Sequence, residues 1–135
     1  MISLLIDANL DGHARLLRNR LFSADWSSIS QGLGVELLFL EDVGLDRHSP
    51  DNVVWQVCQD HGYWLLTANR NQEKADSLEA MIRTASNFDS IPVLTLADAN
   101  RMLQGGDYLD RVVERLLDIL MRKAQFLGTG RLFLP

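Results

Sequence analysis

The strongest constraint on the fold is a set of short apolar runs that alternate with segments of helical periodicity. Five runs are almost wholly apolar and are bounded by polar or turn-forming residues: Met1–Ile6, Val35–Leu40, Tyr63–Leu66, Ile91–Leu96 and Arg131–Leu134. Runs of this length and composition are typical of strands that are buried on both faces. The sequence therefore predicts a sheet that is covered by helices on both sides.

The segments between these runs carry apolar residues at helical spacing, as in the stripe Leu10, Ala14, Leu17 and Leu21. The predicted helices are Leu10–Leu21, a segment opened by Ser49-Pro50 and closed by Gly62, Asp76–Ala85, Asp98–Leu103 and Tyr108–Phe126. Three glycine-containing segments, 31–34, 104–106 and 128–130, are predicted to be turns because they lack a phosphate-binding fingerprint. Alternating strands and helices imply a three-layer α/β sandwich around a mostly parallel sheet of about five strands.

Length and composition limit the class of protein. The 135 residues form a chain of ordinary single-domain size, and we expect one domain over residues 1–135. The net charge of −5 argues against a protein that coats nucleic acid through a broad basic surface. No apolar run is long enough to span a bilayer, so no membrane association and a cytoplasmic location are expected.

The cysteine and the histidines give little indication of a reactive site. Cys58 is the single cysteine, which excludes an internal disulfide, and it lies on the apolar face of its predicted helix. His13, His48 and His61 have no metal-ligand spacing and are expected at the surface or at helix ends.

Acidic and amide side chains follow the first three predicted strands. The set comprises Asp7 and Asn9 after the first strand, Asp51 after the second, and Thr67, Asn69, Arg70, Asn71, Asp76 and Glu79 after the third. In a parallel sheet these residues gather at one edge, where ligands of α/β proteins bind. Carboxylate and amide oxygens suit Mg²⁺ or Mn²⁺ better than zinc, and such ions catalyse phosphodiester hydrolysis.

Each carboxylate also has a purely structural interpretation. Asp7 can cap the helix that follows it, and Asp51 can be favoured in a first helical turn by the helix dipole alone. Asp76 and Glu79 fit an Asp-x-x-Glu capping box. Both the structural and the functional interpretation remain open for these residues.

The segment Leu4–Leu10, which reads Leu-Leu-Ile-Asp-Ala-Asn-Leu, resembles the opening strand of PIN-like proteins, and more narrowly their small Mut7-C-like branch. That branch opens with Asp-x-Asn-Leu, continues with a valine-rich strand and an acidic turn, and places an Asp at the start of the next helix. The corresponding features here are Val35–Leu40, the acidic turn at 41–45, and Asp51. The resemblance covers about the first three quarters of the chain.

The resemblance implies a PIN-like fold and, in active members, an Mg²⁺- or Mn²⁺-dependent ribonuclease. Several members are toxins that pair with a protein antitoxin. By position Asp7 would be the first metal ligand and Asp51 the second acid. Asn69 and Asn71 stand where active relatives usually have carboxylates, so that Asp76 or Glu79 would have to supply the missing charge.

Two hypotheses about function follow. In the first, Asp7, Asp51 and Asp76 hold a catalytic ion, and Arg70 contacts an RNA substrate. The residues that would orient ligands or substrate are Asn9, Thr67, Asn69, Asn71 and Glu79. In the second, favoured by the two asparagines, the domain has lost catalysis and binds nucleic acid or a protein partner. A homodimer that pairs through the C-terminal edge strand is a further hypothesis.

Overall fold

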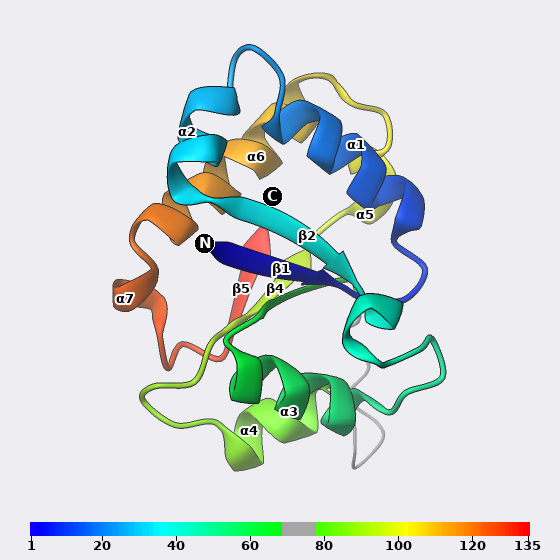
Figure 1. Cartoon of the computed structure of the whole chain (residues 1–135), viewed down its shortest axis with the longest axis vertical. Coiled ribbons are helices and arrows are strands. Elements are labelled where there is room, and N and C mark those ends of the chain that lie inside the picture. Colours follow the sequence, from blue (N-terminus) through cyan, green and yellow to red (C-terminus); the bar gives the residue numbers. More distant parts are fainter. Residues whose placement is uncertain (69–77) are drawn as a thin grey trace.

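The computed structural model describes residues 1–68 and 78–135 and has an α/β fold built on one five-stranded, all-parallel sheet (Figure 1). The strands are β1 (Ile2–Ile6), β2 (Val35–Phe39), β3 (Trp64–Thr67), β4 (Val93–Leu96) and β5 (Arg131–Leu134). The helices are α1 (Asp11–Leu21), α2 (Ser27–Leu33), the 3₁₀ helix η1 (Leu40–Val43), α3 (Asp51–His61), α4 (Leu78–Ala85), α5 (Ala99–Met102), α6 (Gly106–Met121) and α7 (Lys123–Phe126). The predicted fold class and all five predicted strands are confirmed.

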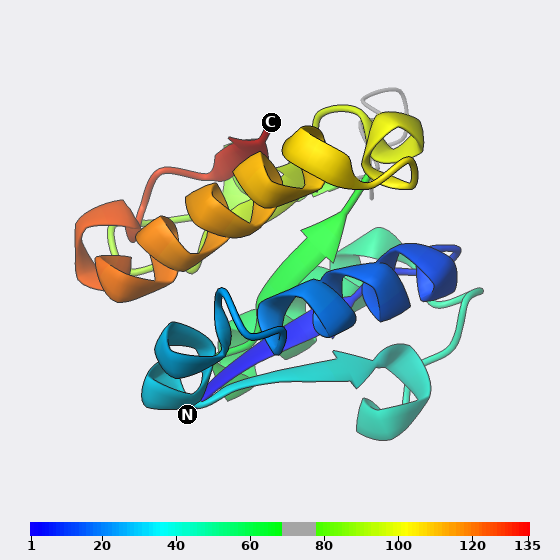
Figure 2. The same ribbon diagram turned by 90° about the horizontal axis from the view of Figure 1, so that it is seen from above.

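Helices cover both faces of the sheet, whose strand order is β2-β1-β3-β4-β5 (Figures 1 and 2). One apolar cluster lies under α1 and α6, and a second lies under α3 and α4. Successive strand residues point to opposite faces, so Leu4 belongs to the first cluster and Leu5 to the second, and neither has exposed surface. This two-sided burial explains why the strands are continuous apolar runs.

The predicted turn at 31–34 is wrong for its first three residues. They belong to α2, which ends at Gly34 with a left-handed φ of 67°. The sequence of α2 is rich in serine and has no apolar stripe, so periodicity could not reveal it. The helix instead packs on α6, with Ser30 fully buried.

The predicted helix Tyr108–Phe126 is two helices. Gly106 begins α6, and Arg122, with φ −114° and ψ 31°, separates α6 from α7. The side of α6 that includes Val112, Leu116 and Leu120 is buried, as the sequence predicts. The apolar stripe continues past the break, and for this reason the sequence could not locate it.

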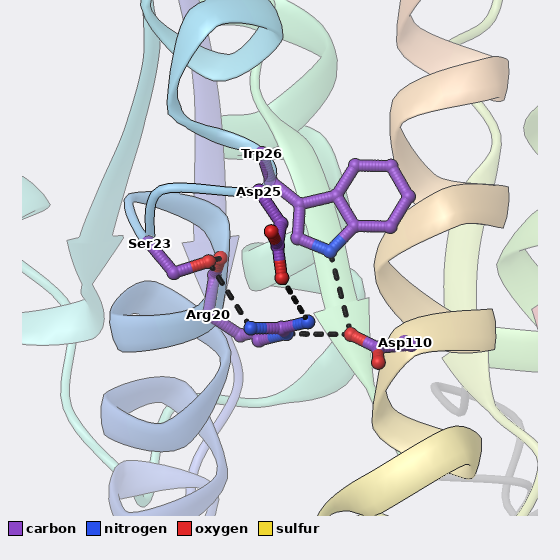
Figure 3. Close-up of polar contacts among 5 residues, drawn as sticks. All are labelled: Arg20, Ser23, Asp25, Trp26 and Asp110. Atoms are coloured by element: carbon purple, nitrogen blue, oxygen red, sulfur yellow. Dashed lines mark hydrogen bonds and ion pairs between the residues drawn. The ribbon is translucent and has the colours of Figure 1, made fainter.

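A polar contact joins the end of α1 to α6 (Figure 3). The Arg20 guanidinium donates to Asp110 Oδ1 at 2.5 Å and to Asp25 at 2.9 Å, and the indole N–H of Trp26 donates to Asp110 Oδ1 at 3.3 Å. The hydrogen bond from Arg20 lowers the pKa of Asp110 below its ordinary value. Two helices that are distant in sequence are thereby held over the same face of the sheet.

Leu116→Ala is expected to lower the free energy of unfolding by about 2–5 kcal/mol, since it removes a fully buried side chain from the larger cluster. Chemical denaturation of the two proteins measures this difference. Glu114→Ala on the exposed side of α6 is the matched control and should change stability by less than about 0.5 kcal/mol. A loss below about 1 kcal/mol for Leu116→Ala would contradict the packing described for α6.

Candidate functional site

The carboxyl ends of β1 and β3 form the point at which the strand order reverses. From β1 the chain passes to β2 on one side and then crosses to β3 on the other side. In open α/β sheets, ligands bind in the crevice outside such a point. Asp7 directly follows β1, and Thr67 is the last residue of β3. The backbone N–H of Asp7 donates to the carbonyl of Leu66 at 2.9 Å, which ties the two strand ends together.

The carboxylate of Asp7 is held in one orientation. Thr67 Oγ1 donates to Asp7 Oδ2 at 2.6 Å, and the backbone N–H of Ala8 donates to Oδ1 at 2.8 Å. Burial raises the pKa of Asp7 above its ordinary value, these two hydrogen bonds lower it in part, and the charge of Asp51 raises it further. Asp7 is therefore a fixed, poorly solvated acid within electrostatic reach of a second one.

Asp51 comes from α3, a helix that covers the face of the sheet to which Leu5 points. It is half-buried in the first turn of α3, and its Oδ2 accepts a hydrogen bond from the backbone N–H of Leu78 in α4 at 3.3 Å. The helix begins at Asp51, one residue later than the sequence indicates, with Pro50 as the N-cap residue. From the sequence, a helix-end role and a role in a site are alternatives for Asp51. In the structure, Asp51 lies in the first turn of α3 and also lines the same pocket as Asp7.

Asp7 and Asp51 line one pocket of about 430 Å³. Its other polar side chains are Asn9, His13, Arg47, Ser49, Thr67 and Asn100. The predicted residues Asp7, Asn9, Asp51 and Thr67 are thus brought together, although they are separated by up to 60 positions in the chain.

Asn9 has an unusual backbone conformation. Its φ of 67° makes it the one non-glycine residue with positive φ in the described chain. Asparagine tolerates the left-handed region better than most residues, because its short side chain bonds locally. The turn at Asn9 redirects the chain from the end of β1 into α1, and its side chain lies at the pocket wall. Such conformations often accompany functional sites.

His13 and Arg47 are pocket residues that the sequence did not indicate. His13 lies in the first turn of α1, and its Nε2 is buried with no hydrogen-bond partner within the described residues. Arg47, between η1 and α3, is exposed and forms no ion pair in the part of the chain that the structure describes. For His13 the sequence did offer one indication, its position in the first helical turn after β1, because that turn lies at the carboxyl end of the strand.

Glu79 lies apart from this pocket. Its carboxylate forms an ion pair with Arg131 of β5, with Oε2 3.1 Å from Nη2. The remaining predicted site residues, Asn69, Arg70, Asn71 and Asp76, are outside the described residues.

The pocket offers two carboxylates, Asp7 and Asp51, that could ligate a divalent ion. Within residues 1–68 and 78–135, no group of three or more His, Cys, Asp and Glu could hold a metal. Mg²⁺ nevertheless binds proteins through one or two carboxylates and keeps several waters. Asp7 and Asp51 supply that number, and each Asp7 oxygen retains a lone pair after its hydrogen bond.

No protein-family model, curated protein or solved structure matches this chain. The structure itself shows a five-stranded parallel α/β fold with a polar pocket at the switch point of its sheet. None of the helices in the described ranges has the length and apolar character needed to cross a membrane.

Asp7→Asn is expected to stabilise the metal-free protein at neutral pH. The pKa of Asp7 is higher in the folded chain than its ordinary value of 3.8, so ionisation of this group opposes folding. The penalty is absent below pH 3.8, appears as the pH rises, and is complete above the folded pKa. Urea denaturation at a series of pH values should therefore show a stability gain for the variant that fades toward acid pH.

Asp89→Asn, at an exposed loop position, is the control for this pH series and should show no such gain. A loss of stability in Asp7→Asn that is the same at every pH would mean that Asp7 serves only to anchor the strand end.

Cys58 should be unreactive in the native protein. Burial raises the pKa of its thiol to about 12, with a smaller contribution from the charge of Asp7, so almost no thiolate exists near neutral pH. A chromogenic thiol reagent should label about one thiol per chain in denaturant and almost none without it. Native labelling at the rate of a free cysteine would contradict the burial of α3 against the sheet.

Proposed function

We propose that this chain is a PIN-like, Mg²⁺- or Mn²⁺-dependent ribonuclease whose ion lies between Asp7 and Asp51. The observation that carries the proposal is that these two carboxylates line one pocket at the switch point of the sheet. Burial raises the pKa of Asp7 and the charge of Asp51 raises it further, so a cation bound beside Asp7 would stabilise its charged form. The resemblance of Leu4–Leu10 to PIN-like proteins connects this site with RNA.

In this proposal the residues of the pocket have different roles. A bound divalent ion supplies activation of water and neutralises charge that develops on the phosphate. Thr67 and the N–H of Ala8 keep the Asp7 carboxylate oriented. Arg47 and His13 also line the pocket, and in this proposal Arg47 binds the phosphate that enters it.

A second candidate function is a PIN-like module that binds RNA or a protein without cleaving RNA. The observation in its favour is that the described residues bring only two carboxylates, and no larger metal-binding group, to the pocket.

Thermal unfolding with Mn²⁺ tests the metal site. At a concentration of about 100 times Kd, Mn²⁺ should stabilise the wild-type protein by roughly 2.7 kcal/mol. Asp7→Asn and Asp51→Asn should lose this stabilisation, whereas the control Asp89→Asn should keep it. In parallel, the wild-type protein should cleave a mixed pool of single-stranded RNA with Mn²⁺ and stop when the metal is chelated.

The outcomes separate the two functions. Equal stabilisation of all four proteins by Mn²⁺, or of none, rejects the metal site. RNA binding without cleavage at saturating Mn²⁺ supports the binding module instead.

A further inference from the structure

Arg131, the first residue of β5, makes side-chain polar contacts with two other elements of the fold. Its side chain is only 10% exposed and forms an ion pair with Glu79 of α4, which is 27% exposed. Nε of Arg131 donates to Glu79 Oε2 at 3.2 Å, and Nη1 donates to Thr95 Oγ1 at 2.5 Å. One guanidinium therefore connects β5, β4 and α4.

The contact with Glu79 leads to Asp51. Glu79 follows Leu78, the first described residue of α4, and the backbone N–H of Leu78 donates to Asp51 Oδ2. The first described turn of α4 thus contacts Arg131 through the Glu79 side chain and Asp51 through the Leu78 backbone. A Cβ atom added to Gly130, the residue before Arg131, would lie only 2.9 Å from Cγ2 of Ile82 in α4. The backbone at the start of β5 therefore approaches this helix closely.

The contact with Thr95 leads to Asp7. Thr95 of β4 is paired in register with Thr67 of β3, and both threonines are fully buried. Thr67 in turn donates its hydroxyl proton to Asp7. Arg131 thus holds the threonine that lies beside the hydrogen-bond partner of Asp7.

We propose that Arg131 is a positioning residue that sets the geometry of both pocket acids, Asp51 through Glu79 and Asp7 through the threonine pair. The proposal rests on the proposed function, because the two acids are the ones assigned to the metal ion. Arg131 does not line the pocket, and it therefore acts through these neighbours. Outer residues that orient metal ligands typically change metal affinity or activity by about 10–100-fold when they are replaced.

The test compares Arg131→Met with the wild-type protein at a temperature at which both are folded. Free Mn²⁺ is measured by its electron paramagnetic resonance signal, which gives Kd without reference to melting. Arg131→Met should raise the Kd for Mn²⁺ by about tenfold or more. It should lower kcat for RNA cleavage and leave KM nearly unchanged, because Arg131 lies outside the pocket.

Three further variants separate positioning from general stability. Arg131→Lys should recover part of the Mn²⁺ affinity, since it keeps the charge but loses the planar guanidinium whose N–H groups reach both Glu79 and Thr95. Glu79→Gln and Thr95→Val interrupt one route each and should each give a part of the loss. Arg122→Met is the control, because it removes a guanidinium that pairs with Asp118 on the surface of α6, and it should bind Mn²⁺ like the wild type.

An unchanged Kd and kcat in Arg131→Met overturns the inference, and so does an equal effect in Arg122→Met. If Arg131→Met does not fold, Glu79→Gln and Thr95→Val decide, and wild-type Mn²⁺ affinity in both overturns it. Asp7→Asn distinguishes failure of the proposed function. If that variant also binds Mn²⁺ like the wild type, the metal site itself is rejected, whereas loss of binding in Asp7→Asn alone rejects only the role of Arg131.

Discussion

The hydrogen bond from Thr67 to Asp7 depends on the parallel pairing of β1 with β3, and it orients one of the two carboxylates that line the pocket. The register that pairs Ile6 with Leu66 brings the next residue of each strand side by side. Because side chains alternate between faces, a slip of one residue would turn Thr67 to the opposite face and leave the buried carboxylate without this donor. The apolar residues that set the register of β1 and β3 therefore also determine that Thr67 lies beside Asp7 at the carboxyl ends of these strands.

The rest of the fold has to compensate for the unfavourable position of Asp7. A poorly solvated carboxylate close to Asp51 is destabilising when it is ionised, because burial and a like charge both disfavour the charged form. The sheet is held by two apolar clusters in which Leu4, Leu5 and Leu66 have no exposed surface. Sites that conflict with local stability in this way are often functional, since a ligand can relieve the conflict.

The fold was more predictable from the sequence than the site. Strands buried on both faces have continuous apolar runs, and helices packed on a sheet have one apolar stripe. Both sequence patterns therefore result from burial. The serine-rich helix α2 left no such pattern, because contacts with α6 hold it in place. In the site, Asp7 and Asp51 could be found from their positions at element ends. His13 and Arg47 could not be found in this way, because the wall of a pocket depends on how distant segments pack in three dimensions. The orientation of Glu79 could not be predicted either, because its partner Arg131 lies far away in the sequence.

Charge connects the proposed ion with the proposed substrate. The chain carries a net charge of −5, and its pocket contains two carboxylates, so a phosphate approaching the metal-free site meets repulsion that the charge of Arg47 offsets only in part. A divalent cation held by Asp7 and Asp51 would cancel the local negative charge and add an attraction for phosphate oxygens. Metal and RNA should then bind with positive coupling, each raising the affinity for the other by the same factor. Under the proposed function, the affinity of this acidic protein for a polyanion would therefore come from the ion at the pocket and not from the surface as a whole.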